Sequence, residues 1–127
     1  YLERELASFN IEIKRFTNVD YLLFNSRKIR KRALRKTKDY MQYKMSADAS
    51  SNVYWTKYLC LKKYDGIIHI KSSFCTPEIG IMPIIDKIAD EYDVPLIHFS
   101  FDANTSEVGF KTRIEAFYDM IEMRRKQ

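Results

Sequence analysis

Glycine, proline and cysteine are all scarce in this chain of 127 residues, which contains three glycines, three prolines and two cysteines. So few glycines leave no phosphate-cradling loop, and neither a G-x-G-x-x-G nor a P-loop pattern occurs. Two cysteines are too few for a disulfide framework, so we expect a reducing, cytoplasmic environment. No apolar run approaches the roughly 18 residues of a membrane span and no signal peptide is recognisable, so we expect a soluble protein.

The composition is that of an ordinary globular domain, with 46% hydrophobic and 31% charged residues. The length suffices to bury a core without metal or disulfides. The chain begins at Tyr1 without a methionine, in what reads as the end of a helix. We therefore expect residues 1–127 to form a single α/β domain that belongs to a longer protein.

The positive charge is concentrated in one segment. Between Arg27 and Lys38 there are eight cations and no acid, so the net charge of +5 leaves −3 for the rest of the chain once these eight are subtracted. Clustered cations can bind nucleic acid, but no helix-turn-helix, zinc-finger, RRM or KH signature accompanies them. A surface helix that docks an acidic partner, or that attracts a phosphate-rich ligand such as coenzyme A, is the preferred interpretation, and nucleic acid the weakest.

Hydrophobic periodicity predicts helices and strands in the first half of the chain. Tyr1–Phe9 is predicted as the end of a helix, with Asn10 as its left-handed C-cap. The segments that follow are predicted as a strand at Ile11–Thr17, a long helix from Asn18 or Asp20 to about Met45, a loop at Ser46–Asn52 and a helix at Val53–Lys63.

The second half predicts a strand, helix, strand and helix in succession. The strands are Ile67–Ile70, after an Asp65-Gly66 turn, and Leu96–Ser100; the helices begin at Thr76-Pro77 and at about Thr112, after a polar loop at Phe101–Gly109. This order predicts a three-layer α/β domain of Rossmann or flavodoxin type with a small, mainly parallel sheet.

Polar side chains and a cysteine lie at or follow the carboxyl ends of the two later strands. Because parallel strands end at the same edge of a sheet, these residues are expected around one crevice: His69, Lys71, Ser72, Ser73 and Cys75 from the first strand, and His98, Ser100 and Asp102 from the second. Cys75 precedes a helix start, where N–H groups and the helix dipole favour the thiolate. Cys60, between two leucines, is expected in the core.

Three alternatives for Cys75 stay open from the residues alone. It could be a small buried residue, as most unpaired cysteines are. It could bind zinc with His69, His98 and Asp102, although no C-x-x-C spacing is present. It could also be a nucleophile with His98 as its base.

Two segments resemble a known family. D-G-I-I-H-I-K-S-S-F-C-T-P-E-I-G-I-M-P and V-P-L-I-H-F-S-F-D-A-N-T-S-E-V-G-F-K-T-R-I-E-A-F-Y-D-M-I are similar to the 2-hydroxyacyl-CoA (2-hydroxyglutaryl-CoA) dehydratase superfamily. The closest resemblance is to the dehydratase-like domain of CoA-substrate-specific enzyme activase-related proteins of anaerobic bacteria. It covers Asp65–Met120 well, and the F-C-x-P after a strand and the T-R-I-E-A-F helix are its most specific signals.

This resemblance implies a site that is only partly present in the chain. In the dehydratases three cysteines hold a [4Fe–4S] cluster, which takes an electron from an ATP-hydrolysing activator for radical dehydration of 2-hydroxyacyl-CoA. Cys75 matches the last of these ligands, and Asp102, Thr112 and Arg113 match residues that brace a loop or cap a helix. Because only Cys60 remains, we expect an isolated domain without activity, whose partners are other domains of its parent, an activator module and an acyl-CoA substrate.

Overall fold

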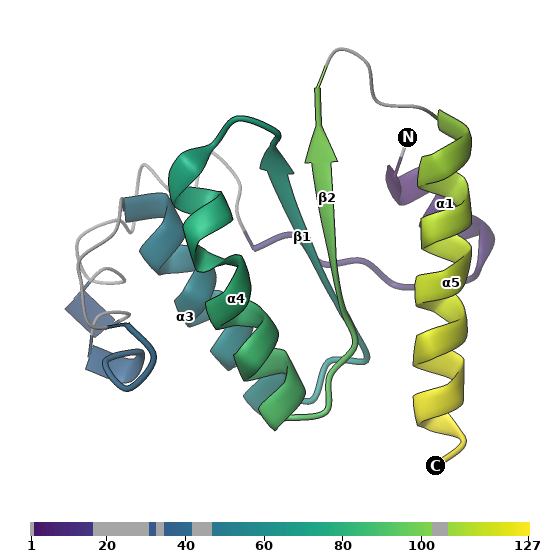
Figure 1. Ribbon diagram of the computed structural model, residues 1–127. Coiled ribbons are helices and arrows are strands. Elements are labelled where there is room, and N and C mark those ends of the chain that lie inside the picture. The colour runs from purple at the N-terminus through teal and green to yellow at the C-terminus, as the bar shows by residue number, and fades with distance from the viewer. Residues whose placement is uncertain (1, 17–30, 33–34, 42–46, 103–106) are drawn as a thin grey trace.

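The computed structural model describes residues 2–16, 31–32, 35–41, 47–102 and 107–127. Along the chain it places helix α1 (Leu2–Ser8), helix α3 (Ala47–Leu61), strand β1 (Ile67–Ser72), helix α4 (Thr76–Glu91), strand β2 (Leu96–Phe101) and helix α5 (Glu107–Arg125). Helices α3 and α4 cover one face of the sheet, and α5 and α1 lie on the other (Figure 1). The predicted three-layer α/β arrangement is therefore confirmed. No helix in these ranges is long and apolar enough to cross a membrane.

Strands β1 and β2 pair in parallel, and α4 connects them as a βαβ crossover. In their register His69 lies opposite His98, and Ile70 lies opposite Phe99. Side chains of a strand alternate between its faces, so Ile67 packs on the α3/α4 side while Ile68 packs on the α5 side. Each strand therefore serves two separate cores.

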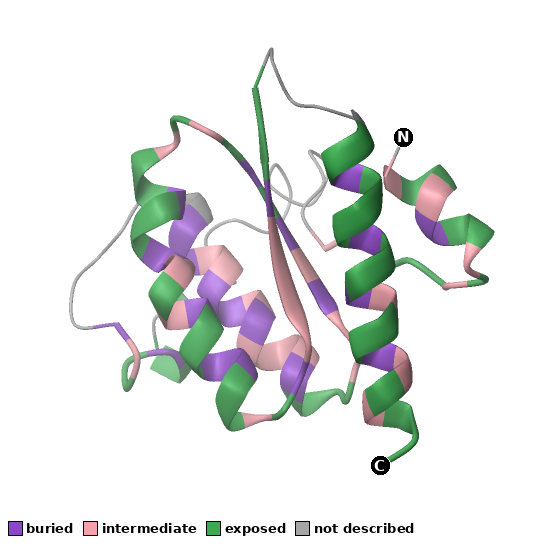
Figure 2. Ribbon diagram, turned by 45° about the vertical axis from the view of Figure 1, so that its right-hand side comes forward, coloured by how far each residue is buried: buried purple, intermediate pink, exposed green. Residues whose placement is uncertain are grey.

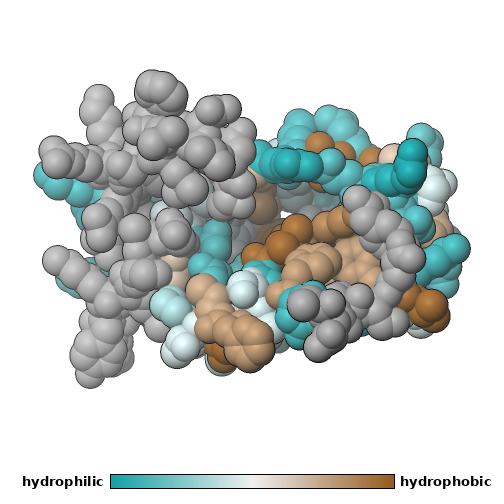
Figure 3. Space-filling view, turned by 90° about the horizontal axis from the view of Figure 1, so that it is seen from above, coloured by the Kyte–Doolittle hydropathy of each residue, from teal (hydrophilic) through white to brown (hydrophobic). Residues whose placement is uncertain are grey.

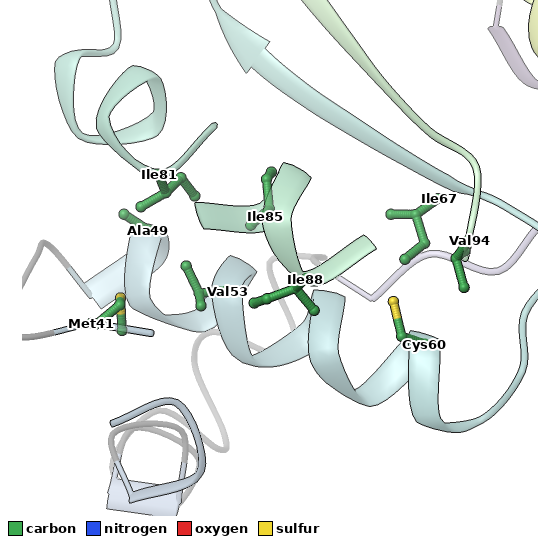
Figure 4. Packing of buried hydrophobic residues seen from close by; sticks show 9 residues of the cluster. All are labelled: Met41, Ala49, Val53, Cys60, Ile67, Ile81, Ile85, Ile88 and Val94. Atoms are coloured by element: carbon green, nitrogen blue, oxygen red, sulfur yellow. The ribbon is translucent and has the colours of Figure 1, made fainter. Parts of the chain in front are cut away.

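The larger core lies between α3, α4 and the start of the sheet (Figure 4). Ile81, Ile85 and Ile88 follow the spacing of one helical face and are fully buried. Figure 2 shows that buried residues lie on the sides of the helices that face inward. The complete set of buried members is Met41, Ala49, Val53, Cys60, Ile67, Ile81, Ile85, Ile88 and Val94. Burial of this stripe explains why α4 lies along the sheet.

The second core is smaller and rich in aromatic rings. Leu6, Phe99, Phe110 and Ile114 form its buried part, between α1, β2 and α5. The rings of Phe99 and Phe110 have centroids 4.3 Å apart. Phe9 stacks on Tyr118 of α5 at 4.9 Å, and this contact attaches the end of α1.

Several predicted elements are confirmed. Asn10, just after α1, has the left-handed φ of 59° expected of a C-cap. Helix α4 begins at Thr76 with Pro77 in its first turn, directly after Cys75 as its N-cap. The two strands end one or two residues later than predicted, since the ladder continues to Ser72 and Phe101.

The predicted strand at Ile11–Thr17 is wrong over its described residues. Ile11–Phe16 lie outside the only sheet found among the described ranges, which contains just β1 and β2. Instead, Ile11 packs against the aromatic core, and Arg15 pairs with Glu3 of α1. Phe16 then inserts its ring beside Trp55 of α3, with centroids 5.2 Å apart. Side-chain docking, rather than strand pairing, fixes this alternating segment.

The predicted loop at Ser46–Asn52 is also wrong, because α3 already begins at Ala47. Its small residues permit close helix packing: Ala49 and Ser50 are buried. Most of the predicted long helix to Met45 lies outside the described residues. Within the described part, Lys31–Arg32 and Arg35–Lys36 are helical, but residues 37–40 form a turn.

Helix α5 begins at Glu107 rather than near Thr112. Thr112 lies in its second turn, where its Oγ1 donates a hydrogen bond to the carbonyl oxygen of Val108 at 3.3 Å. The earlier start carries Phe110 into the aromatic core, where it is 6% exposed. Packing of this ring outweighs the capping-box spacing.

Candidate functional site at the carboxyl edge of the sheet

Cys75 lies where β1 passes into α4. It is the N-cap residue of α4 and half-buried, and its N–H donates a hydrogen bond to the carbonyl oxygen of Ser72 at 3.2 Å. Strand, short turn and helix follow one another as the sequence predicted. The thiol is therefore held in a fixed turn at the edge where parallel α/β sheets place their ligands.

The loops that leave the two strands contact each other. Ser73 Oγ donates a hydrogen bond to Asp102 Oδ2 at 3.3 Å, while Ser72 is exposed. Arg113 of α5 donates from Nη2 to the carbonyl oxygen of His98 at 2.6 Å, and its guanidinium lies 4.8 Å from the centre of the Phe99 ring. Arg113 thus braces β2, whereas Thr112 bonds only within its own helix.

The two histidines of the chain meet beneath α4, on the face of the sheet that is opposite to α5. His69 Nδ1 and His98 Nδ1 are 2.9 Å apart, with the rings at 87° to each other. Their positions follow from the register, in which these two residues are direct neighbours across the strands. Of the residues expected around one crevice, the two histidines are therefore in direct contact.

Each histidine also contacts a carboxylate of α4. His69 Nε2 lies 2.7 Å from Glu78 Oε2, and His98 Nε2 lies 2.7 Å from Asp86 Oδ1. Asn52 of α3 donates from Nδ2 to both oxygens of Glu78, at 3.1 and 3.0 Å. We call these five residues the histidine network; it joins both strands to α3 and α4.

The environment of Glu78 keeps it ionised although its side chain is buried. Desolvation by burial would raise the pKa of Glu78, but the hydrogen bonds from His69 and Asn52 and the electrostatic influence of His69 and Lys71 hold it below its usual value. Lys71 is itself only 8% exposed. The Glu78 carboxylate is therefore an ionised hydrogen-bond acceptor in the interior of the protein.

Sequence reasoning missed Glu78, Asp86 and Asn52. A signal for Glu78 was present, because it falls in register with Ile81, Ile85 and Ile88 on the apolar stripe of α4. A carboxylate on such a stripe requires a partner in the core. Asn52 was hidden within a segment interpreted as a loop, and Asp86, half exposed, carries no comparable signal.

Two alternative roles for the sequence-predicted residues are wrong. Over the described ranges, no group of three or more His, Cys, Asp or Glu side chains is arranged to hold a metal ion, so the zinc site with His69, His98 and Asp102 does not form. Both ring nitrogens of His98 are engaged, by His69 and Asp86. His98 is therefore not the base of a Cys75 nucleophile.

The two cysteines lie at opposite ends of β1. Cys60 packs with Ile67 and Val94 at the amino ends of the strands, as Figure 4 shows, and is 4% exposed. Burial raises the pKa of the Cys60 thiol to about 11, although the charge of Arg124 slightly opposes this. The expectation that Cys60 is a core residue is confirmed. Six residues of strand separate the two ends of β1 by about 16 Å.

Hydrophobic side chains are exposed around the edge that carries Cys75. Figure 3 looks down on this edge and shows hydrophobic surface there, next to hydrophilic residues. Phe74 is 85% exposed and Ile79 is 46% exposed, on either side of Cys75 along the chain. Val108, at the start of α5, is 77% exposed.

One of three comparisons with known proteins found a match, and it includes this edge of the sheet. Residues 19–121, more than half of the chain, match the sequence model of a family described as 2-hydroxyglutaryl-CoA dehydratase, D-component. Searches of curated proteins and of solved structures returned no match. The matched range includes Cys75 and all members of the histidine network. The chain belongs to the 2-hydroxyglutaryl-CoA dehydratase D-component family.

Proposed function

We propose that this domain contributes Cys75 as one thiolate ligand of an iron–sulfur cluster in a protein that dehydrates 2-hydroxyacyl-CoA, or in an activase-related protein that assists that reaction. The observation that carries the proposal is the position of Cys75. It is the half-buried N-cap of α4 at the carboxyl edge of a parallel sheet, in a chain of the dehydratase family. Accessible thiolates at such turns are suited to bind metal.

This chain offers one suitable thiol, that of Cys75, for a site that needs three cysteines. Cys60 is buried at the far end of β1, about 16 Å of strand away, and its thiol pKa is raised to about 11. The remaining ligands must therefore come from other parts of the parent protein or its partner. When bound, the cluster would supply one-electron chemistry, and the family resemblance points to an ATP-hydrolysing activator as the electron source.

The residues around Cys75 hold it in place. Glu78, in the first turn of α4, is fastened to His69 of β1 and to Asn52 of α3. Ser73 is bonded to Asp102 of the neighbouring loop. The exposed rings and aliphatic groups of Phe74 and Ile79 are suited to contact the protein surface that brings the other ligands and to keep water away.

Anaerobic reconstitution of the parent protein with ferrous iron and sulfide tests the proposal. We expect visible charge-transfer absorbance and bound iron in the wild type. Cys75→Ser should lose most of both, whereas Cys60→Ala, the matched control in the core, should retain them. Full absorbance and iron content in Cys75→Ser would remove Cys75 from the ligand set.

A second candidate function is an interaction module whose basic segment docks an acidic partner. The described members of the cationic run, Lys31, Arg32, Arg35, Lys36 and Lys38, are all exposed. Replacement of these five residues by glutamine should weaken capture of the activator or of the other dehydratase component, and high salt should do the same. The cluster proposal does not require these cations, so reconstitution should be unaffected in this variant.

A further inference from the structure

All four ring nitrogens of the chain's two histidines have a polar partner. Each Nε2 faces a carboxylate oxygen at 2.7 Å, and the two Nδ1 atoms face each other at 2.9 Å. The side chains of His69 and His98 are 7% and 15% exposed, so water replaces few of these contacts. The chemistry of each contact therefore determines where the ring protons are.

The three contacts require three protons. An ionised carboxylate only accepts hydrogen bonds, so both Nε2 atoms must carry a hydrogen. Two bare Nδ1 atoms would face each other with their lone pairs at 2.9 Å, which is repulsive, so one hydrogen must lie between them. Two neutral imidazoles carry only two protons. The pair thus holds one in excess and carries one positive charge.

The charges around the pair favour the same protonation state. Glu78 and Asp86 of α4 bring two negative charges, and Lys71 of β1 brings one positive charge. Asn52 of α3 is neutral, and Arg113 of α5 reaches only the backbone oxygen of His98. One shared imidazolium balances the negative charge that these groups would otherwise leave uncompensated, and the buried Glu78 carboxylate is where such a charge is most costly.

We infer that His69 and His98 form a proton-binding site, in which one additional proton shared between their Nδ1 atoms fastens α4 to the sheet. Without this proton the rings must turn apart, although the strand ladder fixes their backbones in register. Either ring that turns loses its contact to Glu78 or to Asp86. Because Glu78 lies in the first turn of α4, the bound proton also fixes the turn that carries Cys75. The inference goes beyond the proposed function and does not depend on a cluster.

Nitrogen-15 NMR of the chain labelled only at histidine tests this site at neutral pH, without iron. The chain contains two histidines, so four ring nitrogens give all the side-chain signals. We expect both Nε2 signals at pyrrole-type positions, both Nδ1 signals between pyrrole-type and pyridine-type positions, and a scalar coupling between the two Nδ1 atoms across the shared hydrogen.

Asp86→Asn and Asp90→Asn provide a matched pair of variants on α4. Asp86→Asn removes one of the two balancing charges and should move both Nδ1 signals towards the pyridine type. Asp90 is exposed and makes no contact with the network in the described structure, so Asp90→Asn should leave all four signals unchanged. Two bare Nδ1 atoms in the wild type, a bare Nε2, or four protonated nitrogens would each overturn the inference.

Discussion

The two faces of the sheet are built from neighbouring residues but have different chemistry. His98 and Phe99 are consecutive in β2, yet His98 points into a charged network under α4, and Phe99 points into the rings packed under α5. The α4 face combines a large aliphatic cluster with buried ions, whereas the α5 face is apolar and aromatic. Strand alternation alone brings these environments within one residue of each other.

The two faces have different roles: the α5 face contributes mainly stability, and the histidine network on the α4 face contributes mainly positioning. Burial of apolar rings on the α5 face is non-directional and independent of protonation. The histidine network is directional, because each contact fixes one nitrogen to one oxygen, and it depends on charge. Cys75 follows the strand and begins the helix that the network joins. The fold therefore holds its candidate ligand with the interactions that have the strictest geometry.

The largest effect is expected from Phe99→Ala on the aromatic face. Phe99 is 1% exposed and contacts both Phe110 and the guanidinium of Arg113. Loss of a buried phenylalanine side chain typically costs about 3–5 kcal/mol of unfolding free energy. We expect a loss of this size at any pH at which the protein folds, measured by urea denaturation.

Phe74→Ala is the matched control, because the same side chain is removed from a position that is 85% exposed. It should change the unfolding free energy by no more than about 0.5 kcal/mol. Phe99→Leu gives an intermediate case if the alanine variant does not fold. Equal effects of the two alanine variants would contradict the assignment of Phe99 to the core.

Glu78→Gln is expected to have a smaller effect that depends on pH. The amide still accepts a hydrogen bond but lacks the charge, so we expect a loss of about 1–3 kcal/mol at neutral pH. The pKa of folded Glu78 lies below its usual value of 4.5. Ionised Glu78 therefore stabilises the fold above about pH 4.5, and this contribution is lost as the pH falls through the folded-state value. Urea denaturation across this range measures it.

The difference between wild type and Glu78→Gln should thus shrink as the solution becomes more acidic. Glu115→Gln is the control on the other side of the sheet, since Glu115 is exposed on α5. It should shift the unfolding free energy little and without this trend. A wild-type advantage over Glu78→Gln that stays constant from neutral to acidic pH would contradict the ionised, hydrogen-bonded Glu78.

The sequence predicted the elements whose signal is local. The apolar stripe of α4, the Pro77 start and the Asn10 cap are written in neighbouring residues, and the parallel pairing followed from the element order. It failed where distant packing decides: Ile11–Phe16 alternates like a strand but docks by its side chains. For the site, the proximity of the two histidines was predictable from the parallel pairing of their strands, and their direct contact follows from the register. Their carboxylate partners required the angle at which α4 crosses the sheet.

Two glycines refine the picture of the aromatic side: Gly66, which lies against α5, and Gly109, which lies within it and has the smallest expected effect. Gly66 precedes β1, and a Cβ added there would lie 2.7 Å from Phe117 Cζ and 2.9 Å from Ile121 Cδ1. Both side chains are buried, so Gly66→Ala should cost about 1–3 kcal/mol through overpacking.

Gly109, in the first turn of α5, has nothing within 4 Å of the added atom. Gly109→Ala should therefore stabilise the helix by about 0.5–1 kcal/mol, because alanine loses less backbone entropy there. Thermal denaturation of the two variants should give shifts of opposite sign, and a neutral Gly66→Ala would show that α5 does not pack closely on the start of β1.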